Sequence, residues 1–313
     1  MKNKQATREA YGKTLAQLAD INPNIVVLDA DLSKSTKTAD FKEIAPERFF
    51  NMGIAEANMM GVAAGLSSCG KIPFVSTFAM FAAGRAYEQI RNSICYPKLN
   101  VKICATHAGL TVGEDGATHQ AIEDLSLMRS IPNMVVINPA DGIETEAAIK
   151  AIVEYNGPCY VRLGRMPVEN VNEYENYKFE IGKGITISEG KDITIIATGI
   201  MVEAAIKAKE ILLNEGIDAR VINIHTIKPI DSEIIIKAAK ETGAIVTAEE
   251  HSVIGGLGSA VSEIVSENYP VRVYKIGVND VFGESGKPSE LLEGYGLTAE
   301  NIVEKVRRIV SEK

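Results

Sequence analysis

The chain has 313 residues, 46% of them hydrophobic and 24% charged, a size and composition that fit two globular domains better than one. Its net charge of −8, without a cluster of lysines and arginines, argues against a nucleic-acid partner. The four isolated cysteines are typical of small buried side chains in a reducing cytosol. The first residues lack an apolar signal-peptide core and no apolar run is long enough to span a bilayer, so we expect a cytoplasmic protein.

Strands and helices are predicted to alternate through the first half of the chain. The pattern predicts helices at 5–20, 53–68, 79–94, 120–129 and 142–154, and strands at 25–31, 49–52, 72–78, 100–105, 134–139 and 159–163. Such alternation indicates an α/β fold with a doubly wound parallel sheet. The helix at 53–68 is apolar nearly all round, so we expect it to be buried.

The stretch 166–184 differs in character because it is acidic, Asn-rich and aperiodic, and we interpret it as an interdomain linker. A second α/β series follows it. Its predicted strands are 193–198, 219–224, 244–249 and 271–276, and its predicted helices are 201–214, 232–240, one that starts after Gly255-Gly-Leu-Gly258, and one from about Thr298. Gly283-Glu-Ser-Gly-Lys-Pro-Ser289 is too short for a phosphate-binding loop, so we reject that function for it.

The loop from Thr106 to Gln120 is the most promising site for a ligand. It holds His107, Asp115 and His119, leaves the carboxyl end of a predicted strand and enters a predicted helix. Ligands bind at that position in open α/β sheets. The alternatives are a solvated loop without a function and a metal site, and the metal site lacks the short ligand spacing that His-based sites use.

Glu56 lies in the first turn of the otherwise apolar helix at 53–68. Either the helix dipole favours a carboxylate there, or a buried carboxylate shares a proton with a ligand base. Phe78 and Phe81 lie three residues apart, so we expect them to share a face. They are core residues or, beside a buried carboxylate, a surface on which a flat heteroaromatic ring stacks. His225 and His251 fit structural or interfacial positions better than catalytic ones.

Three motifs, in chain order, resemble the pyrimidine-binding domain of transketolases: Asn51-Met-Gly-Ile-Ala-Glu56, Ser76-Thr-Phe-Ala-Met-Phe81 and Gly113-Glu-Asp-Gly-Ala-Thr-His-Gln120. The likeness extends over essentially the whole chain. It implies thiamine diphosphate as cofactor and reversible transfer of a two-carbon ketol unit from a ketose phosphate to an aldose phosphate. It also implies a pyrimidine-binding domain at 1–170, a linker at 171–186 and a smaller transketolase-type carboxyl-terminal α/β domain at 187–313.

The resemblance implies a role for each matched residue. Glu56 corresponds to the glutamate that hydrogen-bonds N1′ of the cofactor's aminopyrimidine, and we expect it to act in catalysis with His107 and His119. Phe78 and Phe81 correspond to the aromatic pocket for the pyrimidine. The remaining predicted positions are Asp31 near the cofactor, Arg8, Ser35, His107 and Arg165 for the sugar phosphate, Asp115 for a donor hydroxyl, and His119 for the reacting carbonyl.

Two departures from the family pattern bear on the site. Many transketolases have a third aromatic residue where this chain has Gly84, and Tyr87 is a candidate to fill that space. The chain also lacks the Gly-Asp-Gly motif that holds the cofactor's diphosphate through Mg²⁺. The resemblance therefore implies the carboxyl-terminal half of a split transketolase. A partner chain would supply the Mg²⁺ and diphosphate site, in an assembly with two copies of each chain.

Three other interpretations stay open at this point. The beta subunit of a 2-oxo-acid dehydrogenase's decarboxylating component has a similar domain order, but we do not expect His107 and the 113–120 loop there in this form. A deoxyxylulose-phosphate synthase-like subunit shares the loop but resembles Asp at the position of His107. A non-catalytic interaction subunit would not need Glu56, His107, His119 and Arg165 together.

Overall fold

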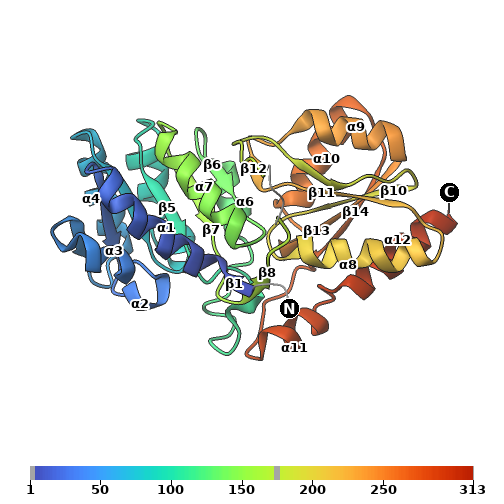
Figure 1. The fold of residues 1–313 in the computed structure, drawn as a ribbon, viewed down its shortest axis with the longest axis horizontal. Coiled ribbons are helices and arrows are strands. Elements are labelled where there is room, and N and C mark those ends of the chain that lie inside the picture. Colours follow the sequence, from blue (N-terminus) through green and yellow to red (C-terminus); the bar gives the residue numbers. More distant parts are fainter. Residues whose placement is uncertain (1–3, 173–176, 313) are drawn as a thin grey trace.

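Seven strands form the first sheet of the computed structural model, which describes residues 4–172 and 177–312 (Figure 1). The strand order is β12-β6-β7-β5-β4-β2-β3, and every pairing is parallel except that of β12 with β6. The strands are β2 (Ile25–Asp29), β3 (Phe49–Asn51), β4 (Ile72–Ser76), β5 (Lys102–Ala105), β6 (Val135–Ile137), β7 (Cys159–Arg162) and β12 (Thr226–Lys228). Helices cover both faces, so the predicted doubly wound α/β fold is confirmed.

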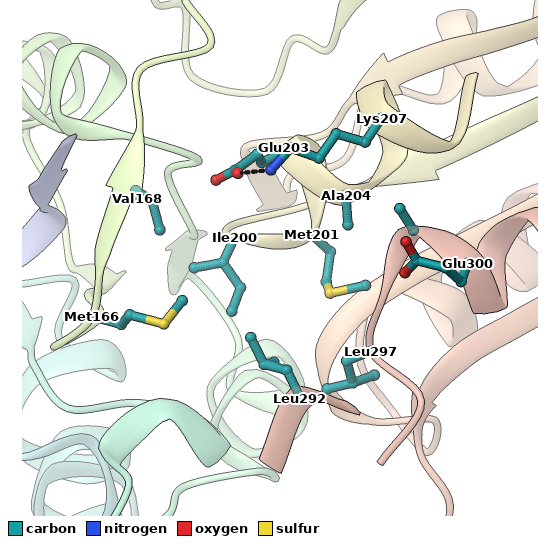
Figure 2. Close-up of a pocket in the computed structure, with 11 residues that line it drawn as sticks. Met166, Val168, Ile200, Met201, Glu203, Ala204, Lys207, Leu292, Leu297 and Glu300 are labelled. Carbon is teal, nitrogen blue, oxygen red and sulfur yellow. Dashed lines mark hydrogen bonds and ion pairs between the residues drawn. The ribbon is translucent and has the colours of Figure 1, made fainter. Parts of the chain in front are cut away.

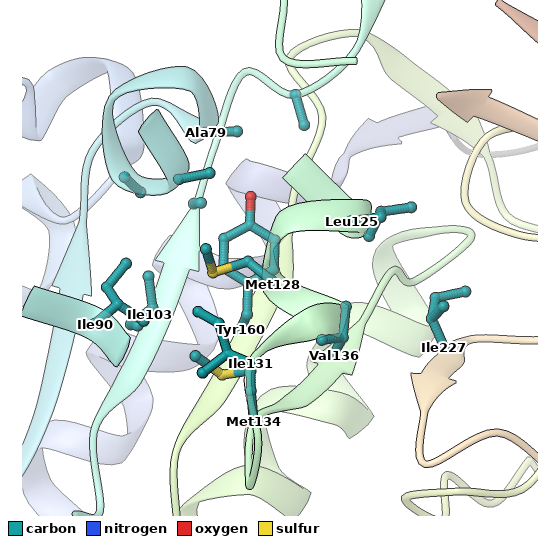
Figure 3. Close-up of a cluster of buried hydrophobic side chains, with 14 of the residues drawn as sticks. Ala79, Ile90, Ile103, Leu125, Met128, Ile131, Met134, Val136, Tyr160 and Ile227 are labelled. Carbon is teal, nitrogen blue, oxygen red and sulfur yellow. The ribbon is translucent and has the colours of Figure 1, made fainter. Parts of the chain in front are cut away.

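One face of this sheet packs against α1 (Thr7–Ile21), α3 (Ala39–Ile44) and α7 (Gly142–Glu154). The other face packs against α4 (Glu56–Ser68), α5 (Tyr87–Gln89) and α6 (Asp124–Ser130). Figure 3 shows part of this second layer, where Met128 and Ile131 lie among side chains of the central strands. Because both faces are buried, the strands are continuous apolar runs and do not alternate apolar with polar residues.

The short elements of the first half lie mainly at the ends of these strands. They are α2 (Ser33–Thr36), the 3₁₀ turns Pro46–Arg48 and Leu110–Val112, and the π-helical turns Phe81–Arg85 and Ile90–Cys95. The regular helix predicted at 79–94 is therefore interrupted. Two further strands, β1 (Lys4–Ala6) and β8 (Pro167–Glu169), pair antiparallel beside the first sheet.

The second sheet has the order β14-β13-β10-β11-β9, with β9 antiparallel to β11 and the other pairs parallel. Its strands are β9 (Ile185–Ser188), β10 (Ile193–Ala197), β11 (Ala219–Asn223), β13 (Ala244–Ser252) and β14 (Arg272–Val278). Helices α8 (Met201–Asn214) and α12 (Ala299–Ser311) pack on one face, and α9 (Ser232–Thr242) and α10 (Leu257–Asn268) on the other. Helix α11 (Pro288–Gly294) lies apart from these layers, toward the first domain (Figure 1).

Three features differ from the sequence-based expectations. Strand β12 belongs to the second half of the chain but completes the edge of the first sheet, and β9 is a strand that the sequence pattern does not predict. Helix α4 is not buried all round, because Gly61, Val62 and Gly65 are exposed. A helix that lies on a sheet buries the side that faces the strands, and in this chain nothing among the described residues covers the opposite side of α4 at these positions.

The two domains are joined by buried polar contacts as well as by β12. Asp141 begins α7 by accepting a hydrogen bond from the Glu144 amide and also accepts from the amides of Val171 and Asn172. Asn223 of β11 donates to the Glu144 carboxylate at 2.8 Å. The domain limits 1–170, 171–186 and 187–313 stay a prediction, and residues 173–176 of the predicted linker lie outside the described residues.

No helix within residues 4–172 and 177–312 has the length and apolar character needed to cross a membrane.

Candidate active site

Most of the predicted site residues follow the carboxyl ends of parallel strands in the first sheet. Asp31 follows β2, Phe78 follows β4, His107 follows β5 and Arg165 follows β7. Glu56 is the first residue of α4, which comes after β3. Because parallel strands end at the same edge, the topology gathers these side chains on one side of the domain.

The Glu56 carboxylate is buried and paired with an arginine that the sequence does not single out. Glu56 is 4% exposed, and its Oε1 accepts a hydrogen bond from Arg85 Nη1 at 3.0 Å. The Arg85 guanidinium also lies over the Phe81 ring, 4.2 Å from the ring centroid. Oε2 of Glu56 accepts no hydrogen bond from any described residue. The carboxylate therefore keeps one oxygen available for a ligand.

Four rings form a cluster beside this carboxylate. Phe78 and Phe81 are nearly parallel, with centroids 5.8 Å apart. The His107 ring stacks on Phe78 at 3.9 Å, and the His119 ring meets Phe81 edge-on at 5.3 Å. The structure thus brings the predicted aromatic pair and both loop histidines together, so the two phenylalanines are not only core residues.

His107 is held in one tautomer by its neighbours. Arg8 Nη1 lies 3.1 Å from His107 Nε2, and an arginine nitrogen can only donate, so Nε2 accepts. Nδ1 then carries the hydrogen and donates it to Thr106 Oγ1 at 2.9 Å. Burial, together with the positive charges of Arg8 and Arg165, lowers the pKa of His107 to about 3. The ring is therefore neutral near pH 7.

Arg8 and Arg165 form a cationic pair next to His107. Thr7 at the start of α1 accepts a hydrogen bond from the Gly164 amide at 2.7 Å, which ties α1 to the end of β7 and brings the arginines near each other. Arg8 Nη1 donates to the Ser35 carbonyl at 2.9 Å, so Ser35 contributes its backbone there. The buried Arg8 Nε has no partner among the described residues. An anionic ligand would satisfy that donor.

Arg165 faces the acidic part of the loop. Its Nη1 donates to the Val112 carbonyl at 2.6 Å and lies 3.7 Å from Asp115 Oδ2 and 3.8 Å from Glu114 Oε2. Arg165 is half-buried, while both acids are exposed. The predicted hydroxyl-binding and phosphate-binding residues are therefore neighbours, and a ligand can exchange with these exposed ion pairs at little cost.

Asp31 sits at the neighbouring strand end in an uncommon backbone conformation. Its φ is 65°, in the left-handed region that few non-glycine residues adopt. Asn51 supports it, because Asn51 Oδ1 accepts from the Asp31 amide at 3.1 Å and Asn51 Nδ2 donates to Asp31 Oδ1 at 2.8 Å. His107, with φ of 56°, has the same strain. Such strain is concentrated at functional sites.

Comparison with known proteins identifies the family. A family model described as the transketolase pyrimidine-binding domain matches residues 3–170, and one described as the transketolase C-terminal domain matches residues 182–302. The chain belongs to the transketolase family. Its two domains are the pyrimidine-binding and carboxyl-terminal domains of that family, whose cofactor is thiamine diphosphate.

The relatives differ in how much of their own length this chain covers. A putative transketolase C-terminal section of Methanocaldococcus jannaschii is 55% identical over 96% of this chain and 94% of its own length. The transketolase of Homo sapiens is 38% identical over 99% of this chain but only 50% of its own length. A solved structure described as a split gene transketolase, inactive beta4 tetramer, matches 99% of both chains with 60% identity and a TM-score of 0.90.

The described residues fit the pyrimidine end of the transketolase cofactor. Glu56 offers a free carboxylate oxygen inside a nearly buried setting, and Phe78 and Phe81 offer aromatic surface beside it. Tyr87, the candidate to fill the space at Gly84, instead lies 3.1 Å from Ser130 Oγ through its hydroxyl. Arg85 covers Phe81 in its place. Among the residues that the structure describes, no group of three or more His, Cys, Asp or Glu side chains is arranged to hold a metal ion.

A pocket of about 300 Å³ lies between the domains (Figure 2). An ion pair between Glu203 and Lys207 of α8 lies on one side of it. None of the predicted site residues lines it. Its apolar lining consists of Met166, Val168, Ile200, Met201, Ala204, Leu292, Leu297 and Ala299.

Proposed function

We propose that this chain is the catalytic carboxyl-terminal subunit of a split transketolase, which transfers a two-carbon ketol unit reversibly between ketose and aldose phosphates. The observation that supports this most is the meeting of Glu56, the aromatic pair, two histidines and two arginines at one sheet edge. The half-length match to the human enzyme and the full-length match to a C-terminal section support the split arrangement.

The partner in this proposal is an amino-terminal transketolase subunit with the Gly-Asp-Gly motif. It would hold Mg²⁺ and the diphosphate, while the present chain holds the pyrimidine, so that the active site forms between chains in an assembly with two copies of each. When bound, the cofactor would supply a nucleophilic carbon for chemistry at the ketose carbonyl. Asp31 would lie on the cofactor side of the site, at the strand end next to that of Glu56.

In this proposal, Glu56 shares a proton with the cofactor. Its Oε2 would bond the pyrimidine nitrogen N1′ and share a proton with it, while Arg85 holds Oε1 in place. Burial of the carboxylate strengthens that hydrogen bond, because water does not compete for it. Phe78 and Phe81 would position the flat ring through stacking.

The substrate would lie along the loop. Arg8 and Arg165 would bind the sugar phosphate, since guanidinium groups match phosphate oxygens and form charge-assisted hydrogen bonds. Neutral His107 would orient Arg8 through Nε2, and the Ser35 carbonyl would do the same from the other side. Asp115 would accept a hydrogen bond from a donor hydroxyl. His119, whose ring edge meets the aromatic pair, would exchange a proton with the reacting carbonyl oxygen.

The test is reconstitution with a partner chain that carries the Gly-Asp-Gly motif. The mixture, with Mg²⁺ and thiamine diphosphate, should transfer ketol units between sugar phosphates, and each chain alone should not. Ketol transfer by the isolated chain would contradict the split-enzyme proposal. Decarboxylation of a 2-oxo acid without ketol transfer by the complex would contradict the reaction assigned here.

A further inference from the structure

The second domain contributes one buried carboxylate to the loop Thr106–Gln120, which we call the donor loop. Glu250 of β13 is 3% exposed, and its Oε1 accepts a hydrogen bond from the Thr111 amide at 2.7 Å. A Cβ atom on Gly109 would overlap the Glu250 carboxyl group, and Gly109 has φ of 80°. The carboxylate therefore occupies a space under the donor loop that only a glycine at this position leaves open.

Backbone contacts from the same strand secure the other end of the donor loop. Arg162 Nη2 donates both to the Glu250 carbonyl at 2.9 Å and to the Ala121 carbonyl at 3.1 Å. The Ser252 amide donates to the Ile122 carbonyl at 2.7 Å. Strand β13 thus contacts the donor loop directly at Thr111 and the chain just after the loop at Ile122, and it is linked to Ala121 through Arg162.

The loop is also packed into the second domain. Leu110 is fully buried in the hydrophobic cluster that contains α8 and α12, and its 3₁₀ turn lies against α11. Gln120 Nε2 donates to the Glu284 carbonyl at 2.9 Å. The segment Gly283–Ser289, which is too short for a phosphate loop, therefore packs on the donor loop and has a structural use (Figure 1).

We propose that Glu250 is a positioning residue of the reaction, which holds the donor loop in the conformation that presents Asp115 and the two histidines to the donor sugar. This inference rests on the proposed function and assigns a task within it to the second domain. The strained φ of His107 needs such support, because a non-glycine residue keeps a left-handed conformation only where its surroundings enforce it.

The preceding residue provides a matched control. Glu249 is also fully buried, but its side chain lies on the other side of β13 and accepts hydrogen bonds from the Leu257 and Gly258 amides at 2.7 and 2.8 Å. These hydrogen bonds cap the first turn of α10 inside the second domain. The Glu249 side chain bonds to no described residue of the donor loop. Changes at Glu249 and Glu250 therefore disturb equally buried carboxylates, and only one of them touches the loop.

The experiment compares Glu250→Ala, Glu250→Gln and Glu249→Ala by two measurements. In the isolated chain, hydrogen exchange of the amides in 107–120 should accelerate about tenfold or more in Glu250→Ala and not in Glu249→Ala. In the complex with the partner subunit, Glu250→Ala should lower kcat/KM for the donor ketose by about 100-fold, as expected for a misplaced catalytic loop. Proton exchange at C2 of thiamine diphosphate, which depends on Glu56, should stay within about threefold of wild type.

Glu250→Gln should recover most of the lost activity, because its amide oxygen can accept from Thr111. If Glu250→Ala does not fold, Glu250→Asp replaces it, since the shorter side chain withdraws the carboxylate from the Thr111 amide. Equal losses of donor kinetics in Glu249→Ala and Glu250→Ala would overturn the proposal, and so would unchanged loop exchange in Glu250→Ala. A wild-type complex without ketol transfer would refute the proposed function alone, since loop exchange is measured without the partner.

Discussion

The carboxyl edges of the two sheets carry similar side chains and use them differently. At the edge of the first sheet, Asp31 and Asp115 are exposed and Arg8 and Arg165 are half-buried, all within reach of a ligand. Near the strand ends of the second sheet, His225, Glu249, Glu250 and His251 are at most 3% exposed.

The difference follows from what each edge faces. The second edge packs against the first domain. There the backbone amide of Asn138 donates to the His225 carbonyl, and the Glu250 carboxylate accepts from the Thr111 amide of the donor loop. Its polar groups are therefore used for assembly. The first edge is not covered in this way at Asp31 and Asp115, and in the proposed function it faces the cofactor and the partner subunit. In the proposed function, the two α/β domains thus divide the tasks of chemistry and support.

The largest expected effect is at Glu56, which lies at the first edge and would start the chemistry by sharing a proton with the cofactor. In the reconstituted complex, Glu56→Gln should slow C2 proton exchange of thiamine diphosphate by about 100-fold or more, because an amide cannot share the proton. The melting temperature should change little, since Gln can still accept from Arg85. Near-normal C2 exchange would remove Glu56 from this role, and Glu249→Gln is the buried-carboxylate control from the second edge.

The next effect concerns phosphate binding. Arg165→Ala should lower kcat/KM for phosphorylated ketoses by about 10- to 100-fold, as expected for loss of hydrogen bonds to a charged group. For unphosphorylated ketoses, kcat/KM should fall by no more than about threefold. Arg91→Ala is the control, because Arg91 is exposed and bonds to Asn92 away from the loop. Equal weakening of both substrate types would argue against a phosphate contact.

A smaller effect is expected at Arg85, because its side chain is 54% exposed and solvent screens its pairing with Glu56. Arg85→Ala should weaken cofactor binding by about two- to fivefold. Arg85→Lys keeps the charge but loses the flat surface over Phe81, so it should recover only part of the loss. Titration of each variant complex with cofactor measures the affinity. Wild-type affinity in Arg85→Lys would show that the stacking on Phe81 does not contribute to cofactor binding.

The last expected effect is on the pH dependence of stability, at the second edge. Burial raises the pKa of Glu249 to about 7, above the usual 4.5. The folded state then holds a proton that the unfolded state releases, so this group stabilises the fold below about pH 4.5 and loses that contribution as the pH rises toward 7. His251 and His225 have the opposite sign, because burial lowers the pKa of each to about 4.

The variant Glu249→Gln isolates this contribution. The wild type should lose about 1–3 kcal/mol more unfolding free energy than the variant between pH 4.5 and 7. Chemical denaturation at several pH values measures the difference. The contribution of His225 cancels because both proteins contain it, whereas His251 Nδ1 lies 3.7 Å from Glu249 Oε2 and titrates together with it. Parallel curves for the two proteins would show that Glu249 does not titrate in this range.

Much of the fold and part of the site follow from local sequence signals. Alternating apolar strands and amphipathic helices predict two α/β domains, and the loop with His107 and His119 is predicted at the carboxyl end of a strand, where ligands bind in such sheets. Arg165 follows only from the family resemblance. These signals are readable because strand and helix periodicity, turn residues and parallel topology depend on neighbouring residues. The motifs around Glu56, Phe81 and His119 are also local, and their residue types and order are enough to indicate the transketolase family.

Only the tertiary structure decided which distant residues meet. Arg85 lies 29 positions from Glu56, and Glu250 lies 139 positions from Thr111. Strand β12 joins a sheet whose other strands all come from the first 162 residues. No local pattern encodes such pairings, because they arise from how whole layers pack and which buried polar groups must find partners. The sequence by itself thus determined the edge of the first sheet at which the candidate site lies, and packing of the second domain decided which residues contact its loop.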